Sequence, residues 1–480
     1  MVKTTCLRRD VISAALGLDK QSGLCQSPGR GRWTKPIGAR PRDRPRAPTP
    51  SGGEMKARIM VVAILAATLA AAASTASGSV RTAKANSITV WLMVDAQSGW
   101  ANVVAEANAS FKAKHPGADV KVEYQTWGDH LTKFDATIAG GNVPDVLEFG
   151  NTETTKYMAN GALKQLKAAN FPNSKTWLKG LRGSCTYNSK LFCVPYYAGA
   201  RAVIYRKDQY KSAGIARTPR SQAEFLADGK KLMKHFGAND PNYSAFYFAG
   251  KNWYASLAYV YDYGGQIATR KGNKWVGTLE KSAAIKGLTV AKTTVRALSR
   301  ASKTTDEAHP QQSLVFAKGH VASFIGNGWE WPYALNKDSG NPALANVVGA
   351  YPMPSHVRGK LMPEFLGGSD LAIPAQSKNA SLAADWIKAY TSTSAETGFA
   401  KVGNIPNTTK LAGVNKDNPQ LAPFAVAAAS SWFVPTAPNW VNVENADVLQ
   451  NMLVQIYTGS KSVTAAAKSA DKQIEKILNG

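Results

Sequence analysis

A regular exchange of strand-like and helix-like patterns between residues 88 and 149 constrains the fold more than any other feature of this chain. Residues 88–94, 120–125 and 143–149 have the continuous or alternating apolar composition of strands. The two segments between them carry apolar residues at helical spacing, and each ends at glycine. This strand–helix–strand–helix–strand order predicts an α/β fold with a mixed, mostly parallel sheet flanked by helices.

Three loops should gather at one edge of this sheet, because ligands bind beyond the carboxyl ends of parallel strands. The loops that follow the three predicted strands are residues 95–100, 127–129 and 150–154. We therefore expect a ligand at these loops.

The length of the chain predicts two lobes, since 480 residues with 44% hydrophobic content exceed one ordinary core. The stretch LFCVPYYAGARAVIYRKD, residues 191–208, predicts a strand that leaves one lobe and enters the other. Two further hinge candidates lie at 365–374 and 399–407. We expect hinge strands around a ligand cleft, with a first lobe of residues 87–198 and 372–415 and a second lobe of residues 199–371 and 416–480.

The amino-terminal part of the sequence predicts export rather than structure. Residues 1–54 are rich in Pro, Gly and Arg, which indicates a mistranslated or disordered upstream segment. Residues 55–76 combine a short basic start, an apolar run and small residues, as in a signal peptide, and residues 77–86 read as a linker. The apolar run is shorter than the roughly 20 residues of a membrane span, although retention as an anchor stays open. No lipobox cysteine follows it, so we expect a periplasmic or extracellular protein associated with the cell envelope.

The formal net charge of +26 raises the question of a nucleic-acid partner. Lys and Arg are scattered singly, without a basic helix, a zinc-finger spacing or a nucleic-acid-binding aromatic strand. The pattern favours a basic solvated surface and no nucleic-acid partner, and it could raise the encounter rate with acidic sugars or an anionic envelope. No phosphate-binding glycine loop is found, and we expect no cofactor.

Cys185 and Cys193 flank TYNSKLF, in which Asn188 and Ser189 favour a turn. In an oxidising compartment this hairpin predicts a disulfide at the entry to the crossover strand. A metal pair or a catalytic thiol is the alternative, but no histidine lies nearby in the sequence.

Six segments, in order and at family-like spacing, resemble a known family. They are ITVW at 88, FKAKHPGADVKVEYQTW at 111, GGNVPDVLEFGNTET at 140, VPYYAGARAVIYRKD at 194, IGNGWEW at 325 and FLGGSDLAIP at 365. The chain is identified as a member of the extracellular solute-binding proteins of ABC sugar importers, the maltose-binding-protein-like family. The variants GNTET and PYYAGAR are most similar to the branch that takes up N-acetylglucosamine, chitobiose and related oligosaccharides. The resemblance implies the two-lobed periplasmic-binding-protein fold, in which each lobe is a mixed, mostly parallel sheet flanked by helices.

A sugar site needs flat aromatic rings for stacking and a few fixed polar groups. The resemblance places Trp329 and Trp440 where family members stack sugar rings, with core packing as the alternative for each. Glu330 either bonds a hydroxyl or faces water. Asn252 and Trp253 lie in a loop where relatives touch sugar.

The first lobe and the crossings supply the remaining candidates. Asn151, Thr152 and Glu153 follow a strand end, where helix capping by the first two is the alternative. Trp127 lines the cleft or staples the lobe. Along the crossover strand and the 365–374 strand the candidates are Tyr197, Arg201, Gly368, Ser369 and Asp370. At Gly199 the chain leaves space where some relatives place a side chain, which predicts room for an N-acetyl group.

The expected mechanism is closure of two lobes around a ligand that contacts both. A monomeric binder would then dock on the transmembrane subunits of an ABC permease. We expect no catalytic residue and no metal site, and hence no enzyme. A secreted glycosidase and a binder of a non-sugar solute, such as a polyamine or a polyol phosphate, are the alternatives.

Overall fold

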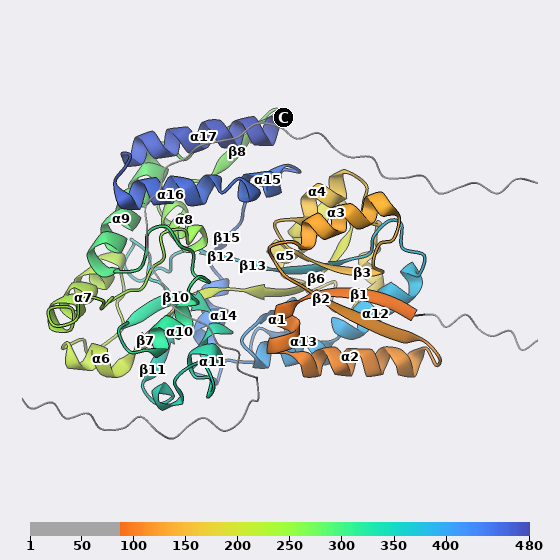
Figure 1. Ribbon diagram of the computed structural model, residues 1–480, viewed down its shortest axis with the longest axis horizontal. Helices are drawn as coiled ribbons and strands as arrows, with labels where there is room; N and C mark the ends of the chain where they lie inside the picture. The colour runs from red at the N-terminus through yellow and green to blue at the C-terminus, as the bar shows by residue number, and fades with distance from the viewer. Residues whose placement is uncertain (1–86) are drawn as a thin grey trace, which may run out of the picture. The chain divides into compact units, whose positions relative to one another are not determined.

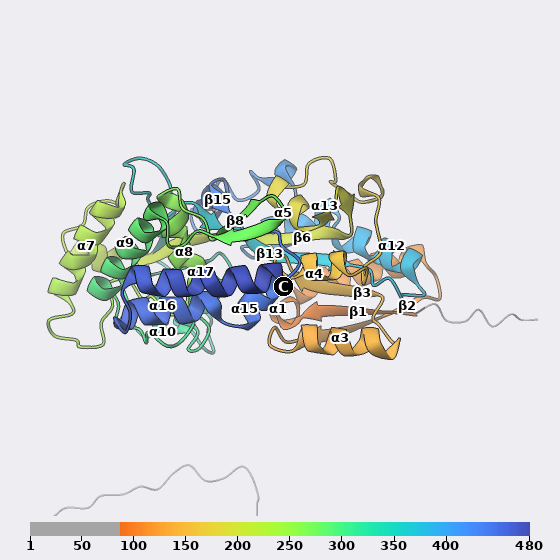
Figure 2. The same cartoon turned by 90° about the horizontal axis from the view of Figure 1, so that it is seen from above.

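A computed structural model describes residues 87–480, which belong to one compact unit (Figures 1 and 2). The expectations for residues 1–54, 55–76 and 77–86 lie outside the described residues. Among residues 87–480, no helix is both long and apolar enough to cross a membrane.

The first lobe is built on a six-stranded sheet of order β14-β6-β13-β3-β1-β2. The three strands predicted from the sequence pair in parallel, with β1 at the centre of that group. β13 runs antiparallel between β3 and β6, and β14 is antiparallel to β6. The strands are β1 (Ser87–Met93), β2 (Asp119–Gln125), β3 (Val146–Gly150), β6 (Cys193–Gly199), β13 (Gly367–Ala372) and β14 (Ile405–Pro406).

Helices cover both faces of this sheet because each buries one apolar stripe against it. The predicted helical segments form α2 (Ala101–Lys114) and α3 (His130–Gly140), and α3 ends at Gly141 in a left-handed conformation with φ 70°. Figure 1 shows α3 and α4 on one face and α2, α12 and α13 on the other. The further elements of this lobe are α1 (Val94–Gly99), α4 (Thr154–Ala159), α5 (Lys179–Ser184), β4 (Thr186–Tyr187), β5 (Lys190–Leu191), α12 (Ala380–Tyr390) and α13 (Thr393–Lys401).

The second lobe differs from the expected fold in the direction of its strands. Its sheet, β10-β7-β11, pairs β7 (Arg201–Arg206) antiparallel with both β10 (Ser323–Asn327) and β11 (Val348–Tyr351), so it is not mostly parallel. The direction of β7 is set by the crossover from the first lobe, and both partners run against it. Parallel pairing in this lobe is found between the short strands β12 (Glu364–Phe365) and β15 (Ser431–Trp432) and at isolated bridges such as Ser244 with Val321.

Helices surround this second sheet and enclose a large apolar core. Figure 2 shows α16 and α17 side by side along this lobe. The elements are α6 (Lys207–Ser212), α7 (Gln222–His235), α8 (Trp253–Asp262), β8 (Ala268–Lys271), β9 (Lys274–Gly277), α9 (Ser282–Leu298), α10 (Gln312–Ala317), α11 (Glu330–Ala334), β12 (Glu364–Phe365), α14 (Ala422–Ala428), β15 (Ser431–Trp432), α15 (Trp440–Asn445), α16 (Val448–Thr458) and α17 (Val463–Asn479).

Two direct connections between strands join the second lobe to the sheet of the first lobe. β6 ends at Gly199, and β7 begins at Arg201 in the second sheet. β12 pairs with β15, and two residues after Phe365 the chain enters β13 of the first sheet. The expected lobe boundary after residue 371 therefore falls inside β13. The predicted disulfide between Cys185 and Cys193 is present, at the start of β6.

Candidate ligand site between the lobes

Trp329 follows β10 of the second lobe and is half-buried against side chains of the first-lobe core. Its ring lies edge-on to Tyr197, with 6.2 Å between the ring centroids. A methyl group added at Gly199 would stand 2.5 Å from Cη2 and 2.6 Å from Cζ3 of this indole. The space predicted beside Gly199 is thus filled by Trp329, and the idea that it accommodates an N-acetyl group is wrong for this conformation.

The loop that carries Trp329 also touches the first lobe through its backbone. A Cβ atom at Gly328 would lie 2.3 Å from the carbonyl oxygen of Gly403, which has φ 96°. Only residues without a Cβ allow this approach, because a Cβ atom on either glycine would overlap the backbone of the other. Two loops that are 75 positions apart in the chain therefore meet between the lobes.

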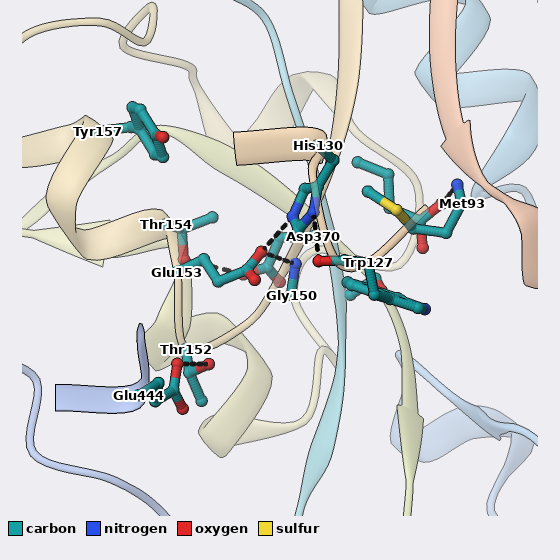
Figure 3. A network of polar contacts seen from close by, with 12 residues as sticks. Met93, Trp127, His130, Gly150, Thr152, Glu153, Thr154, Tyr157, Asp370 and Glu444 are labelled. Atoms are coloured by element: carbon teal, nitrogen blue, oxygen red, sulfur yellow. Dashed lines mark hydrogen bonds and ion pairs between the residues drawn. The ribbon is translucent and has the colours of Figure 1, made fainter. Parts of the chain in front are cut away.

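The three predicted first-lobe loops converge on one polar network (Figure 3). The Glu153 Oε2 atom accepts hydrogen bonds from the Gly150 amide at 2.8 Å and from His130 Nε2 at 2.9 Å. His130 Nδ1 lies 3.1 Å from the Trp127 carbonyl oxygen, and the Trp127 indole donates to Asp95 at 2.6 Å. Trp127 remains 41% exposed, so its ring is available to a ligand.

His130, which the sequence analysis did not select, holds this network together. Burial by itself lowers the pKa of its imidazole, but the hydrogen bond and charge of Glu153 outweigh burial and raise the pKa above its ordinary value. Both ring nitrogens face acceptors, which the doubly protonated imidazolium satisfies best. Its position three residues after Trp127, at the start of α3, is the only local signal that could have identified it.

Thr152 links this network to the second lobe. Its hydroxyl donates to Glu444 Oε2 at 3.1 Å, and Glu444 belongs to α15 (Figure 3). Burial raises the pKa of the Glu444 carboxyl to about 8, and the charge of Glu153 adds to the rise. Glu444 was also missed from the sequence, although it lies one helical turn after Trp440.

Arg201 stands where the crossover strand enters the second lobe, and it is 6% exposed. Its guanidinium carbon lies 4.5 Å from the centroid of the Tyr254 ring. The ion pair from its Nη2 to Glu307 Oε1 measures 3.7 Å, longer than a hydrogen bond. Arg201 is thus a buried cation with hydrogen-bonding capacity to spare.

Several predicted site residues serve the interior of the second lobe. Trp440 is 1% exposed and Trp253 is 4% exposed, and both belong to its apolar core. Asn252 caps α8 by accepting from the Ala255 amide at 3.1 Å. Glu330 accepts from the Asn327 amide at 2.9 Å, and burial raises the pKa of its carboxyl to about 7.

Other predicted residues serve the interior of the first lobe. Asp370 is fully buried and accepts from Thr154 and Ser184, and burial raises the pKa of its carboxyl to about 8. The side-chain amide of Asn151 donates to the backbone carbonyl of Leu366, and its backbone N–H donates to the backbone carbonyl of Gly368. Ser369 is buried beside Tyr197, with 3.5 Å between the two hydroxyls. These residues fix the strand ends that carry the site.

Residues 91–397 match the family described as bacterial extracellular solute-binding protein. The chain belongs to this family. This solute-binding protein is 34% identical over 396 residues to the diacetylchitobiose binding protein DasA of Streptomyces coelicolor, which covers 82% of this chain and 89% of DasA. A putative binding protein of Brucella abortus is 25% identical over 389 residues, 78% of this chain and 89% of that protein.

Solved structures agree with the fold of this solute-binding protein. The GacH receptor of Streptomyces glaucescens superposes with a TM-score of 0.70 at 21% identity, over 82% of this chain and 98% of that chain. The sugar-binding protein MalE of Xanthomonas citri gives a TM-score of 0.70 at 19% identity, over 82% and 97%. The predicted family and the two-lobed α/β fold class are therefore confirmed.

Proposed function

We propose that this solute-binding protein is the exported binding component of an ABC sugar importer, and that its ligand is a chito-oligosaccharide built from N-acetylglucosamine. The observation that carries the proposal is the position of Trp329, a half-buried aromatic ring of one lobe against Tyr197 of the other. The 34% sequence identity between this chain and a diacetylchitobiose binding protein supports this ligand class.

The proposed site is narrower than the set of candidates from the sequence. Trp329 and Trp127 offer rings, Arg201 and Tyr254 offer donors, and the carboxylate of Glu153 lies beside them on the first lobe. Trp440, Trp253, Asn252, Glu330 and Asp370 are proposed to support the site from within the lobes, because each is buried. We propose that the chain crosses between the lobes at residue 200, at residue 366 and between residues 412 and 421.

The proposed mechanism is lobe closure without covalent chemistry. A sugar that bonds Arg201 on one side and the Glu153 network on the other stabilises the closed form through its differential affinity. The closed protein then docks as a monomer on the transmembrane subunits of a permease. Nucleic acid has no part in this function.

Calorimetry against neutral, amino and acidic oligosaccharides, with glycerophosphocholine as a non-sugar solute, tests the ligand class. We expect binding of N-acetylated chito-oligosaccharides, and no binding to any sugar would refute the proposal. Prolonged incubation with the same oligosaccharides should leave them intact, whereas hydrolysis would establish a glycosidase instead.

Replacement of Trp329 by alanine tests the site itself. Loss of one stacked ring should weaken sugar binding by about 1–2 kcal/mol, roughly 5- to 30-fold, without unfolding the protein. Trp275→Ala, which removes a half-buried ring from β9, is the matched control and should leave affinity unchanged. Equal affinity of Trp329→Ala and the parent would mean that Trp329 only packs between the lobes.

A further inference from the structure

The second lobe contains a pocket at the amino-terminal end of β10. Its volume is 150 Å³, and its polar lining is formed by Asn242, Ser244, Tyr247, Arg300, Lys318 and His320. The pocket lies where Ser244 bridges to Val321, just before β10, whereas Trp329 follows the other end of this strand. Five strand residues at about 3.3 Å each place the pocket roughly 17 Å from the loop between the lobes.

Three basic side chains from separate segments meet at this pocket. Arg300 follows α9, Lys318 follows α10, and His320 precedes β10. His320 Nδ1 pairs with Asp240 at 2.6 Å. Among residues 87–480, Arg300 and Lys318 form no ion pair, so their charges are not neutralised by the protein. The pocket therefore carries a net positive charge even though one acidic group lies beside it.

Tyr247 adds a donor that the protein does not use. Its side chain is only 7% exposed, yet within the described part of the chain its hydroxyl forms no hydrogen bond. Burial raises the pKa of this phenol, so the hydroxyl keeps its proton. The ring of Tyr247 is buried but its hydroxyl oxygen stays in reach of solvent, so it can donate to water or to a ligand.

Ser244 completes the donor set from the floor of the pocket. It is fully buried, and its Oγ accepts a hydrogen bond from the Arg300 amide at 2.9 Å. That bond uses an oxygen lone pair and leaves the hydroxyl proton free to donate. Two neutral donors and two uncompensated cations thus converge, and such a set suits a ligand that only accepts hydrogen bonds.

We propose that this pocket binds a tetrahedral oxyanion, a phosphate group held by Arg300 and Lys318 and bonded by the hydroxyls of Tyr247 and Ser244. The volume equals that of about five water molecules at roughly 30 Å³ each, which accommodates such a group. The phosphate group belongs either to a free inorganic ion or to an anionic phosphodiester polymer. The site is separate from the sugar site and is independent of the proposed function.

The test is calorimetry of the full-length chain at low ionic strength, with inorganic phosphate as the first probe and poly(glycerol phosphate) as the second. We expect saturable phosphate binding that weakens with added salt. Arg300→Gln should weaken it at least tenfold, and Tyr247→Phe about fivefold, because that change removes one hydrogen bond and little volume. Lys472→Gln, an equal charge change on an exposed position of α17, should have no effect.

Folding and sugar affinity of each variant are measured in parallel. Unchanged sugar affinity shows that the variants fold, and it separates a failure here from a failure of the proposed sugar function. A polymer affinity well above that of free phosphate, lost in Arg300→Gln, identifies the polymer as the source; equal affinities identify the free ion. The proposal is overturned if neither probe binds, or if Arg300→Gln and Tyr247→Phe bind phosphate as tightly as the parent and Lys472→Gln do.

Discussion

Replacing Gly199 by alanine should weaken ligand binding without destabilising the protein. Gly199 is the last residue of β6, and its added methyl group would meet Trp329 at 2.5 Å and the Asn327 Oδ1 atom at 2.8 Å. Ordinary contacts of a Cβ atom are 3.4–4 Å, so these neighbours must move by about 1 Å. Both neighbours belong to the second lobe, whereas Gly199 belongs to the first sheet.

The clash should therefore raise the free energy of the closed form relative to the open form. Overpacking of this kind costs about 1–3 kcal/mol, which corresponds to a roughly 5- to 150-fold loss of affinity if the closed form binds the ligand. Opening of the lobes relieves the contact. Alanine also restricts the unfolded chain, which stabilises a compatible position by about 0.4–1 kcal/mol. The melting temperature without ligand should thus stay equal or rise slightly.

Calorimetry with the ligand found in the oligosaccharide panel measures the affinity, and calorimetric melting measures stability. Gly183→Ala is the matched control, because its Cβ would meet nothing within 4 Å. Combining Gly199→Ala with Trp329→Ala should cost less than the sum of the two single losses, since removal of the indole leaves only the contact with Asn327. Parental affinity for Gly199→Ala, or additive losses in the double variant, would refute this account of the lobe contact.

Three further predictions concern titration and the disulfide. In the open protein an exposed Glu444 should have its ordinary carboxyl pKa, whereas between the closed lobes its pKa is about 8, so closure takes up a proton. Sugar affinity should therefore fall as the pH rises from about 4.5 to 8. Glu444→Gln should make the affinity independent of pH over this range. The pKa of His130 is raised, so its ion pair with Glu153 stabilises the fold fully below about pH 6.5, and this stabilisation is lost as the pH rises through the raised pKa. Glu153→Gln should therefore lower the melting temperature more at pH 6 than at pH 8. Opening the short loop by replacing Cys185 and Cys193 with serine should cost about 2–3 kcal/mol in denaturant unfolding, and an unchanged midpoint would contradict this.

Two carboxylates at the lobe interface were not selected from the sequence, where the acidic site candidates were Glu153, Glu330 and Asp370. Glu307 pairs with Arg201 at 3.7 Å. Burial raises the pKa of Tyr254, and the charges of Glu444, Glu307 and Glu153 add to the rise. Because Glu307 and Glu444 lie 137 positions apart and neither follows a predicted strand, no local pattern could connect them.

The sequence by itself determined the three parallel strands of the first sheet, the two helices between them and the three loops beyond these strands. Those features depend on periodicity and on turn residues within about ten positions, and the Cys185–Cys193 hairpin is local in the same way. Only the tertiary structure decided that Trp329 stands between the lobes while Trp440 is buried at 1% exposure. Trp329 immediately precedes the short helix α11 and Trp440 is the first residue of the short helix α15, so what distinguishes them is which distant elements pack over each ring. The direction of the second sheet was decided in the same way, since strand pairing between β7 and β10 joins segments about 120 residues apart.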